Sequence, residues 1–301
     1  MWCSAPSVIH TSRGHSSGQS RQRSGEASMQ IQEKVGLVTG AASGIGRATA
    51  LELINQGVKG LALVDISESA VVALAQEINE AADRDVALAF AGDVTDESFR
   101  SRVFDETTEQ RGMVQIMVPA AGIFRDRLAV KIDRETGDAD IYPADVFRQV
   151  LEVNLIHPVY WAMETIARIA VDRNQRGLQK WHPDEKVQGT IIFIGSVSSQ
   201  GNRGQVSYAS TKAGLEGAAS TLMKEAMFHG VRTGVIHPGF VDTPLLQGMP
   251  EGYVEQNILP DTQLGRLIRP EEIADAICFM VRNSAVSGQL WADAGWHPTA
   301  A

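Results

Sequence analysis

Tyr208 and Lys212 lie four residues apart in the segment SYASTK, a spacing that brings a phenol and an ammonium group onto one face of a helix. A phenol with a pKa of about 10 is a poor base at neutral pH, but a neighbouring positive charge favours its ionised form. Such a pair suits proton transfer to or from a substrate oxygen. The same spacing is also typical of two side chains that simply cover neighbouring helix surface, so the pair has to be weighed with the rest of the chain.

A second candidate site lies in the segment VGLVTGAASGIG, where Gly40, Gly44 and Gly46 stand between an expected strand and an expected helix. Glycine suits a tight turn that lets a pyrophosphate approach the backbone, and the helix N-terminus offers amide donors and a positive dipole. Asp65 ends the next expected strand, where its carboxylate can accept hydrogen bonds from ribose hydroxyls and repel a 2′-phosphate. The alternative is that Asp65 only caps the following helix.

The same region favours NAD(H) over NADP(H). Neither Ser43 nor Ile66 supplies the cation that a 2′-phosphate would need, and Arg47 is the nearest residue that argues against this preference. Asp93 ends another expected strand in the segment GDV, where it would lie beside an adenine ring. A cap for the helix expected from residue 96 is the competing interpretation of Asp93.

The elements that position these residues follow from alternating apolar runs and segments of helical period. Strand, helix and strand in repetition predict an α/β fold with a single doubly wound parallel sheet of about seven strands, of the Rossmann type, with helices on both faces. The strands are expected at 35–39, 61–64, 86–90, 114–118, 190–194, 233–236 and 289–291, and the helices at 45–56, 68–82, 96–110, 144–171, 207–229 and 271–282.

One domain is expected over residues 29–301. Residues 1–28 are rich in Ser and Gly, so we expect a disordered tail or a misassigned start, with an Arg- and Ser-rich organelle transit peptide as the remaining alternative. The polar segment 172–188 is expected to be a surface excursion. The segment 243–268, rich in Pro and Gly, is expected above the carboxyl ends of the strands as a substrate loop.

Composition excludes several classes of function. The formal net charge of −9 argues against nucleic acid and anionic membranes as partners. Cys3 and Cys278 are the only cysteines, so no disulfide framework is expected and a reducing, cytoplasmic location fits. The sequence contains no run of about 18 or more apolar residues, so no transmembrane helix is expected. The seven histidines do not cluster, so no metal site is predicted, and His157 and His237 are expected to be packing residues.

The motifs resemble those of the short-chain dehydrogenase/reductase superfamily over about residues 31–298. Within it, the segments 121–132, 201–217 and 237–245 are most similar to the 3-oxoacyl-acyl-carrier-protein reductases. The matching motifs, in order, are TGAASGIG at 39–46, Asp93-Val94, Ala121-Gly122, Asn154, Ser196, Tyr208-x-x-x-Lys212 and Pro238-Gly239.

The resemblance implies an NAD(P)-dependent enzyme that interconverts a secondary alcohol and a ketone. Tyr208 would be the general acid/base, and Lys212 would lower the pKa of the phenol together with the cationic nicotinamide while holding the ribose hydroxyls. Ser196 would hydrogen-bond the substrate oxygen, although a serine that caps a turn is the simpler interpretation of this residue alone. Asn154 would bind a water that links Lys212 to solvent.

The resemblance also implies the residues that contact the cofactor. Pro238-Gly239 would shape the backbone against the nicotinamide, and Thr243 would bond its carboxamide, although Thr243 is also a plausible N-cap before Pro244. The implied contacts are Gly40, Ser43, Gly44, Ile45, Gly46, Asp65, Asp93, Val94, Ala121, Gly122, Tyr208, Lys212, Pro238, Gly239, Val241 and Thr243.

The sequence departs from the family at residues 119–122, which read Pro-Ala-Ala-Gly where Asn-Asn-Ala-Gly is usual. Loss of both amide side chains removes hydrogen bonds that tie the central strands together, and Pro119 lacks a backbone donor. We expect activity to survive, because cofactor contact at this turn is mostly through the backbone; reduced stability or an altered site is the alternative.

Partners and alternatives follow from the same resemblance. It implies a homotetramer or homodimer formed through the helices at 144–171 and 207–229. An alternative function is reduction of a 3-oxoacyl thioester in fatty-acid synthesis, with Arg125 and Arg127 meeting an acyl carrier protein or its phosphopantetheine, although two loop arginines are also typical of solvated surface. A catalytically silent nucleotide-binding scaffold is the third hypothesis.

Overall fold

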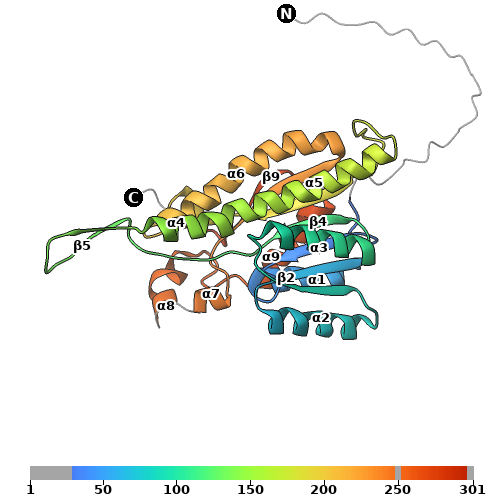
Figure 1. Cartoon of the computed structure of the whole chain (residues 1–301). Coiled ribbons are helices and arrows are strands. Elements are labelled where there is room, and N and C mark those ends of the chain that lie inside the picture. Colours follow the sequence, from blue (N-terminus) through green and yellow to red (C-terminus); the bar gives the residue numbers. More distant parts are fainter. Residues whose placement is uncertain (1–28, 248–251, 297–301) are drawn as a thin grey trace, which may run out of the picture.

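The computed structural model describes residues 29–247 and 252–296; the tail 1–28, part of the expected substrate loop and the last five residues lie outside the described residues. Seven parallel strands form one sheet in the order β3-β2-β1-β4-β7-β8-β9. Helices α1, α2 and α9 lie on one face and α5 and α6 on the other (Figure 1). The predicted fold class is confirmed.

The bounds of the main elements agree with the sequence pattern to within a few residues. The strands of the sheet are β1 (Val35–Thr39), β2 (Gly60–Asp65), β3 (Ala87–Ala91), β4 (Val114–Pro119), β7 (Gly189–Ile194), β8 (Val231–Pro238) and β9 (Gly288–Ala292). The longer helices are α1 (Gly44–Asn55), α2 (Glu68–Ala82), α3 (Glu97–Gln110), α4 (Ala144–Leu151), α5 (His157–Gln175), α6 (Val206–Ala226) and α9 (Pro270–Arg282).

The central strands are mostly apolar because helices cover both of their faces. Every residue of β1, β7 and β8 is buried. The chain direction across the sheet reverses at β1, which pairs with β2 on one side and β4 on the other. Ligands of such folds bind outside the carboxyl ends of the strands at this reversal, so the topology alone places the site beside Thr39 and Pro119.

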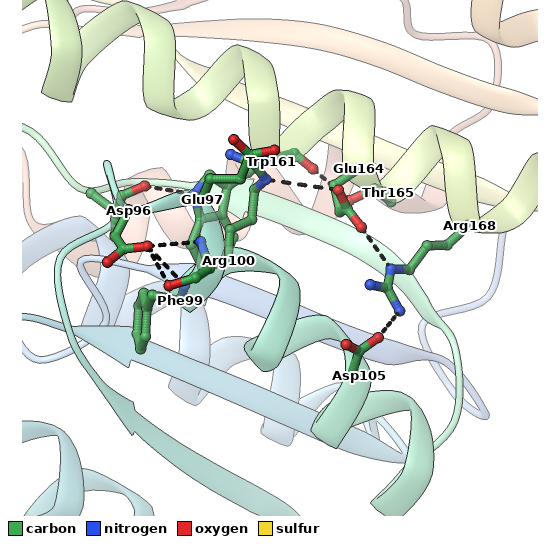
Figure 2. Close-up of polar contacts among 11 residues, drawn as sticks. Asp96, Glu97, Phe99, Arg100, Asp105, Trp161, Glu164, Thr165 and Arg168 are labelled. Atoms are coloured by element: carbon green, nitrogen blue, oxygen red, sulfur yellow. Dashed lines mark hydrogen bonds and ion pairs between the residues drawn. The ribbon is translucent and has the colours of Figure 1, made fainter.

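Helix α5 is held against α3 by both apolar and polar contacts (Figure 2). Trp161 is fully buried between Phe99 and Phe104, with ring centroids 6.3 and 5.8 Å away, and its Nε1 donates to the Val94 carbonyl at 2.8 Å. Farther along the helix, Arg168 pairs with the Asp105 carboxylate at 2.6 Å. These contacts fix which side of α5 faces inward.

The helix expected at 144–171 contains an irregularity. Between α4 and α5 lies a π-helical turn, Glu152–Ile156, and the three pieces form one continuous long helix (Figure 1). A π turn inserts one extra residue, which the 3.6-residue periodicity of the apolar positions does not reveal. Within the described residues, no helix has both the length and the apolar character needed to cross a membrane.

Two further elements were not predicted. Strands β5 (Val130–Ile132) and β6 (Ala139–Ile141) form an antiparallel hairpin after β4. Three-residue strands are too short for alternation of apolar and polar residues to stand out. The described part of the expected substrate loop contains α7 (Pro244–Gln247), α8 (Tyr253–Asn257) and a 3₁₀ turn at Leu259–Asp261.

Candidate active site

A cavity of about 760 Å³ opens at the carboxyl ends of the central strands. Every residue predicted to contact cofactor or substrate lines it except Asn154 and Lys212. Asp65 lies in the part formed by β2 and the glycine-rich loop, whereas Ser196 and Tyr208 lie in the part formed by β7 and α6. The cavity is large enough for a dinucleotide and a small substrate, since ligand pockets commonly measure about 300–1,000 Å³.

The loop between β1 and α1 leaves no room for side chains. Gly40 has φ +63°, in the left-handed region, and a Cβ there would lie 2.7 Å from the Ala121 Cα. A Cβ on Gly46 would lie 2.0 Å from the Gly40 carbonyl oxygen. The bare backbone and the N-terminus of α1 together form a cradle suited to a pyrophosphate.

Asp65 braces this cradle. Its Oδ2 accepts the Ala42 N–H at 3.0 Å, and its Oδ1 accepts the Ser67 N–H at 3.0 Å, where Ser67 is the N-cap residue of α2. The carboxylate therefore supports the start of α2 and also lines the cavity, so the structural and the ligand-binding interpretations are compatible.

Asp93 lines the cavity from a turn of its own. Its Oδ1 accepts the N–H and the hydroxyl of Thr95 at 2.9 and 2.8 Å. The N-cap of α3 is Asp96, which accepts the N–H groups of Ser98 and Phe99. The helix-cap interpretation of Asp93 is therefore wrong, because the cap lies three residues later.

Tyr208 lies in the first turn of α6, and the edge of its ring meets Phe124 with centroids 4.4 Å apart. Burial raises the pKa of Tyr208, the hydrogen bond with Ser196 lowers it, and the charge of Asp126 raises it further. Ser196 also accepts the Ser198 N–H at 3.1 Å at the start of the 3₁₀ turn Val197–Gln200, so it caps a turn as well as lining the cavity together with Tyr208.

Lys212 lies beneath Tyr208, one turn farther along α6. Its Nζ is 5.4 Å from the centroid of the Tyr208 ring and donates to the Ile194 carbonyl at 2.7 Å. Burial lowers the pKa of Lys212 to about 8. In the chain alone burial thus raises the pKa of the phenol despite the neighbouring lysine, and the expected lowering by lysine and a cationic nicotinamide together stays a prediction.

Asn154 lies at the centre of the π-helical turn and is buried. Its Oδ1 accepts the Ile123 N–H and its Nδ2 donates to the Ile123 carbonyl, both at 2.8 Å. This two-point contact ties the long helix to the loop that follows β4. The predicted water relay through Asn154 stays a prediction, since the side chain is already engaged with the backbone.

A connection that sequence analysis missed joins β1, β4 and the long helix. Thr39 Oγ1 accepts the Ala121 N–H at 3.2 Å and donates to His157 Nε2 at 3.1 Å. The remaining ring nitrogen of His157, Nδ1, donates to the Val153 carbonyl at 2.9 Å. Burial lowers the pKa of His157 to about 4, so the ring is neutral and this pattern fixes its tautomer.

His237 contacts the backbone of Ser196 from the side away from the cavity. Its ring stacks on Trp291 with centroids 4.2 Å apart, and its Nδ1 lies 3.1 Å from the Ser196 carbonyl oxygen. The residue is fully buried, and burial lowers its pKa. It contacts the backbone of Ser196 and does not line the cavity.

The two loop arginines differ in position. Arg125 lines the cavity, whereas Arg127 is paired with Asp140 on the hairpin. Among residues 29–247 and 252–296, no three His, Cys, Asp or Glu side chains gather in a way that would hold a metal ion.

Comparison with known proteins agrees with this geometry. A model of the short chain dehydrogenase family matches residues 34–253. The 3-oxoacyl-[acyl-carrier-protein] reductase FabG of Thermotoga maritima is 31% identical over 265 residues, which cover 87% of this chain and 96% of that protein. The cis-4-hydroxycyclohexanecarboxylate dehydrogenase of Sinomonas cyclohexanicum is 29% identical over 88% of this chain and 96% of its own. The crystal structure of gox2181 shares the fold, with a TM-score of 0.74 at 24% identity, and covers 89% of this chain and 97% of its own.

Proposed function

Because this chain belongs to the short chain dehydrogenase family, we propose that it is an oxidoreductase that interconverts a secondary alcohol and a ketone with Tyr208 as general acid/base. The observation that carries the proposal is the position of Tyr208 and Ser196, which line the same cavity as the glycine-rich cradle. The residues that line this cavity would hold a nicotinamide cofactor, which would supply or accept the hydride.

The chain's own residues bind and orient the reactants. The cradle from Gly40 to Gly46 would hold the pyrophosphate, and the backbone at Gly239 is held close to the sheet, since a Cβ there would lie 2.7 Å from the Asp293 carbonyl oxygen. In the direction of reduction, Tyr208 donates its phenolic proton to the carbonyl oxygen while Ser196 hydrogen-bonds the same oxygen. The ammonium of Lys212 then stabilises the phenolate until a proton returns from solvent.

The preference for NAD(H) over NADP(H) is part of the proposal. Asp65 lines the cavity, and its charge would repel a 2′-phosphate. Arg47, the nearest cation, contacts both carboxylate oxygens of Glu77 at 2.7 Å and is thereby drawn toward α2. Both observations support recognition of a ribose with a free 2′-hydroxyl.

Self-association through the long helix is also proposed. Three exposed apolar side chains, Ile156, Tyr160 and Met163, recur at helical spacing on its outer side. The same stripe on a second copy of the chain can pack against it, because homo-oligomers pair identical surfaces about a two-fold axis. The buried free thiol of Cys278 supports a reducing, cytoplasmic location.

A second candidate function is reduction of a 3-oxoacyl thioester. It is favoured by the FabG relatives of the chain and by Arg125, which lines the cavity where a phosphopantetheine would enter. If Arg125→Ala together with Arg127→Ala leaves turnover of a carrier-linked substrate unchanged relative to a free ketone, this candidate fails.

The test of the main proposal is oxidation of NADH with a panel of ketones. Wild-type protein should turn over at least one ketone, and Tyr208→Phe should lower kcat by about 10²–10⁴-fold while NADH still binds. Tyr160→Phe makes the same chemical change on the exposed face of α5 and should leave kcat unchanged. Cofactor binding without turnover of any ketone would instead favour a silent nucleotide-binding scaffold.

A further inference from the structure

The hairpin after β4 stands apart from the body of the molecule. All residues from Arg125 to Ile141, called the arm below, are exposed. The arm projects beyond the N-terminal end of α4 (Figure 1). A two-stranded ribbon alone is at best marginally stable, and it leaves both strand edges open to pairing with other chains.

One face of the arm is apolar. The register pairs Val130 with Ile141 and Ile132 with Ala139, so these four side chains share a face, with Lys131 and Asp140 on the other. Val130, Ile132 and Ile141 are 55%, 57% and 68% exposed. Three β-branched apolar side chains in water on one narrow ribbon indicate a surface that another molecule covers.

Hydrogen bonds hold the base of the arm beside the start of α6, the helix that carries Tyr208. The Tyr142 hydroxyl donates to the Arg125 carbonyl at 2.7 Å and accepts from Ser207 Oγ at 2.9 Å. The Arg127 N–H donates to the Gly204 carbonyl at 2.8 Å. Ser207 precedes Tyr208 in the first turn of α6, and Gly204 lies just before that helix. The start of α6 therefore holds the base of the arm in place.

The arm leads directly into the long helix. A two-fold axis that pairs this helix with its copy in a second molecule indicates what covers the arm. The helix runs from Ala144 to Gln175, about 50 Å at 1.5 Å per residue. Its inward side is held on α3 (Figure 2), and Tyr160 lies near the middle of its exposed stripe. A two-fold axis through this stripe pairs two helices antiparallel, so the start of one helix lies opposite the end of the other.

The far end of the helix complements the arm. Val171 and Leu178 are exposed apolar residues at that end, and Lys180 and Lys186 lie in the segment that follows it. Acidic side chains dominate the tip of the arm, which carries Asp133, Glu135 and Asp138 against Arg134. Of the two acids in the receiving segment, Glu185 is already paired with Arg173 at 2.6 Å, and Asp184 lies 3.2 Å from His182. Apolar area and charge therefore match between the two ends of one helix.

We propose that the arm of one protomer packs across the end of α5 of a second copy, covering the partner's Val171 and Leu178 with its apolar face. The proposal rests on the helix pairing given under Proposed function, and it is independent of the redox chemistry. The apolar face of the arm alone is far smaller than the roughly 1,200–2,000 Å² of a stable interface, so it suits an addition to a contact between the same two molecules better than the capture of an unrelated protein.

Disulfide trapping tests the contact in the full-length chain with Cys3 replaced by serine; the native Cys278 is buried. Ile132→Cys and Leu178→Cys proteins are prepared separately, mixed to allow exchange of protomers and oxidised. A disulfide-linked dimer is expected in the mixture and in the double variant. Within one chain the two residues lie at opposite ends of the helix, far beyond the Cα separation of about 7 Å that a disulfide allows. Lys131→Cys, on the opposite face of the arm, is the matched control and should not link.

Three other outcomes would contradict the proposed contact. A dimer by light scattering without a disulfide link in the mixture would overturn the arm contact and leave the helix pairing standing. A monomer would overturn both. Linking of Ile132→Cys to itself alone would show that arms meet arms, which also contradicts the proposal. As a second measurement, Ile141→Asp should weaken dimerisation at least tenfold and Lys131→Glu far less; equal effects would contradict the assigned face.

Discussion

Thr39 Oγ1 and His157 Nε2 lie 3.1 Å apart, joining strand β1 to the long helix that carries Asn154. The family's usual Asn-Asn-Ala-Gly would place two amide side chains nearby, and this chain has Pro119 and Ala120 instead. The hydrogen bonds from Ala121 to Thr39 and from Thr39 to His157 restore a polar connection between the strands and the helix. This connection needs no amide side chain at residue 119 or 120, and the effect of those residues on stability stays a prediction.

His157 should make the protein sensitive to acid. Its pKa is about 4 in the folded chain and 6.5 in the unfolded chain, so the unfolded state binds a proton first as pH falls. The contribution of neutral His157 to the free energy of unfolding is fully present above pH 6.5. It decreases between pH 6.5 and 4, by on the order of 3 kcal/mol. His157→Gln, which does not titrate, should flatten that part of the curve in urea unfolding experiments at several pH values; an unchanged slope would contradict the prediction.

Asp65 should control the choice of cofactor. Asp65→Asn removes the charge that repels a 2′-phosphate while keeping an oxygen acceptor for the Ala42 N–H. The ratio of the Kd values for NADPH and NADH should fall by about tenfold or more, because each tenfold change needs only about 1.4 kcal/mol. Fluorescence titration gives both constants. Asp93→Asn, in the same cavity, is the control and should leave the ratio unchanged; a native preference for NADPH would overturn the role of Asp65.

Asp126 should shift the pH dependence of the reaction. Its negative charge raises the pKa of Tyr208, so Asp126→Asn lowers that pKa. Because alcohol oxidation needs the phenolate, its rise in kcat/KM with pH should move to lower pH. Asparagine still accepts the hydrogen bond that Gln205 donates at 2.7 Å. Asp140→Asn, farther along the arm and paired with Arg127, should leave the profile in place; equal shifts in both variants would refute the assignment.

Gly46→Ala should abolish cofactor binding and destabilise the fold. The added Cβ would lie 2.0 Å from the Gly40 carbonyl oxygen, a backbone atom that cannot move without opening the cradle. A loss of several kcal/mol is expected, as for other overpacked sites. Ser43→Ala, three residues earlier, should change stability little, because the Ser43 side chain makes no cap hydrogen bond. Thermal unfolding with and without NADH separates the two effects; an undisturbed Gly46→Ala protein would show that the loop is less tightly packed.

The seven-stranded sheet was predictable because long apolar strands and amphipathic helices repeat in a regular order. The family resemblance predicted from Gly40, Asn154 and Tyr208 is confirmed. The loop motifs meet because each follows a strand whose carboxyl end lies at one side of the sheet, whereas Asn154 and Tyr208 are carried by helices. The His157 connection and the arm could not be predicted in this way. His157 contacts Thr39, which lies 118 residues away in sequence, and no local pattern marks the pair.

The position of β1 in the sheet has a consequence for how the chain folds. Strand β1 is made first, yet one of its two ladders joins Val35 to Val114 and so requires β4. Strand β4 in turn pairs with β7, so Ile116 finds Thr190 only after the long helix has been synthesised. Parallel pairings over such distances are slow to form, and a nascent chain that ends before β4 leaves one edge of β1 open. Until β4 has been made, the open edge of β1 is therefore a place where the nascent chain is prone to aggregate.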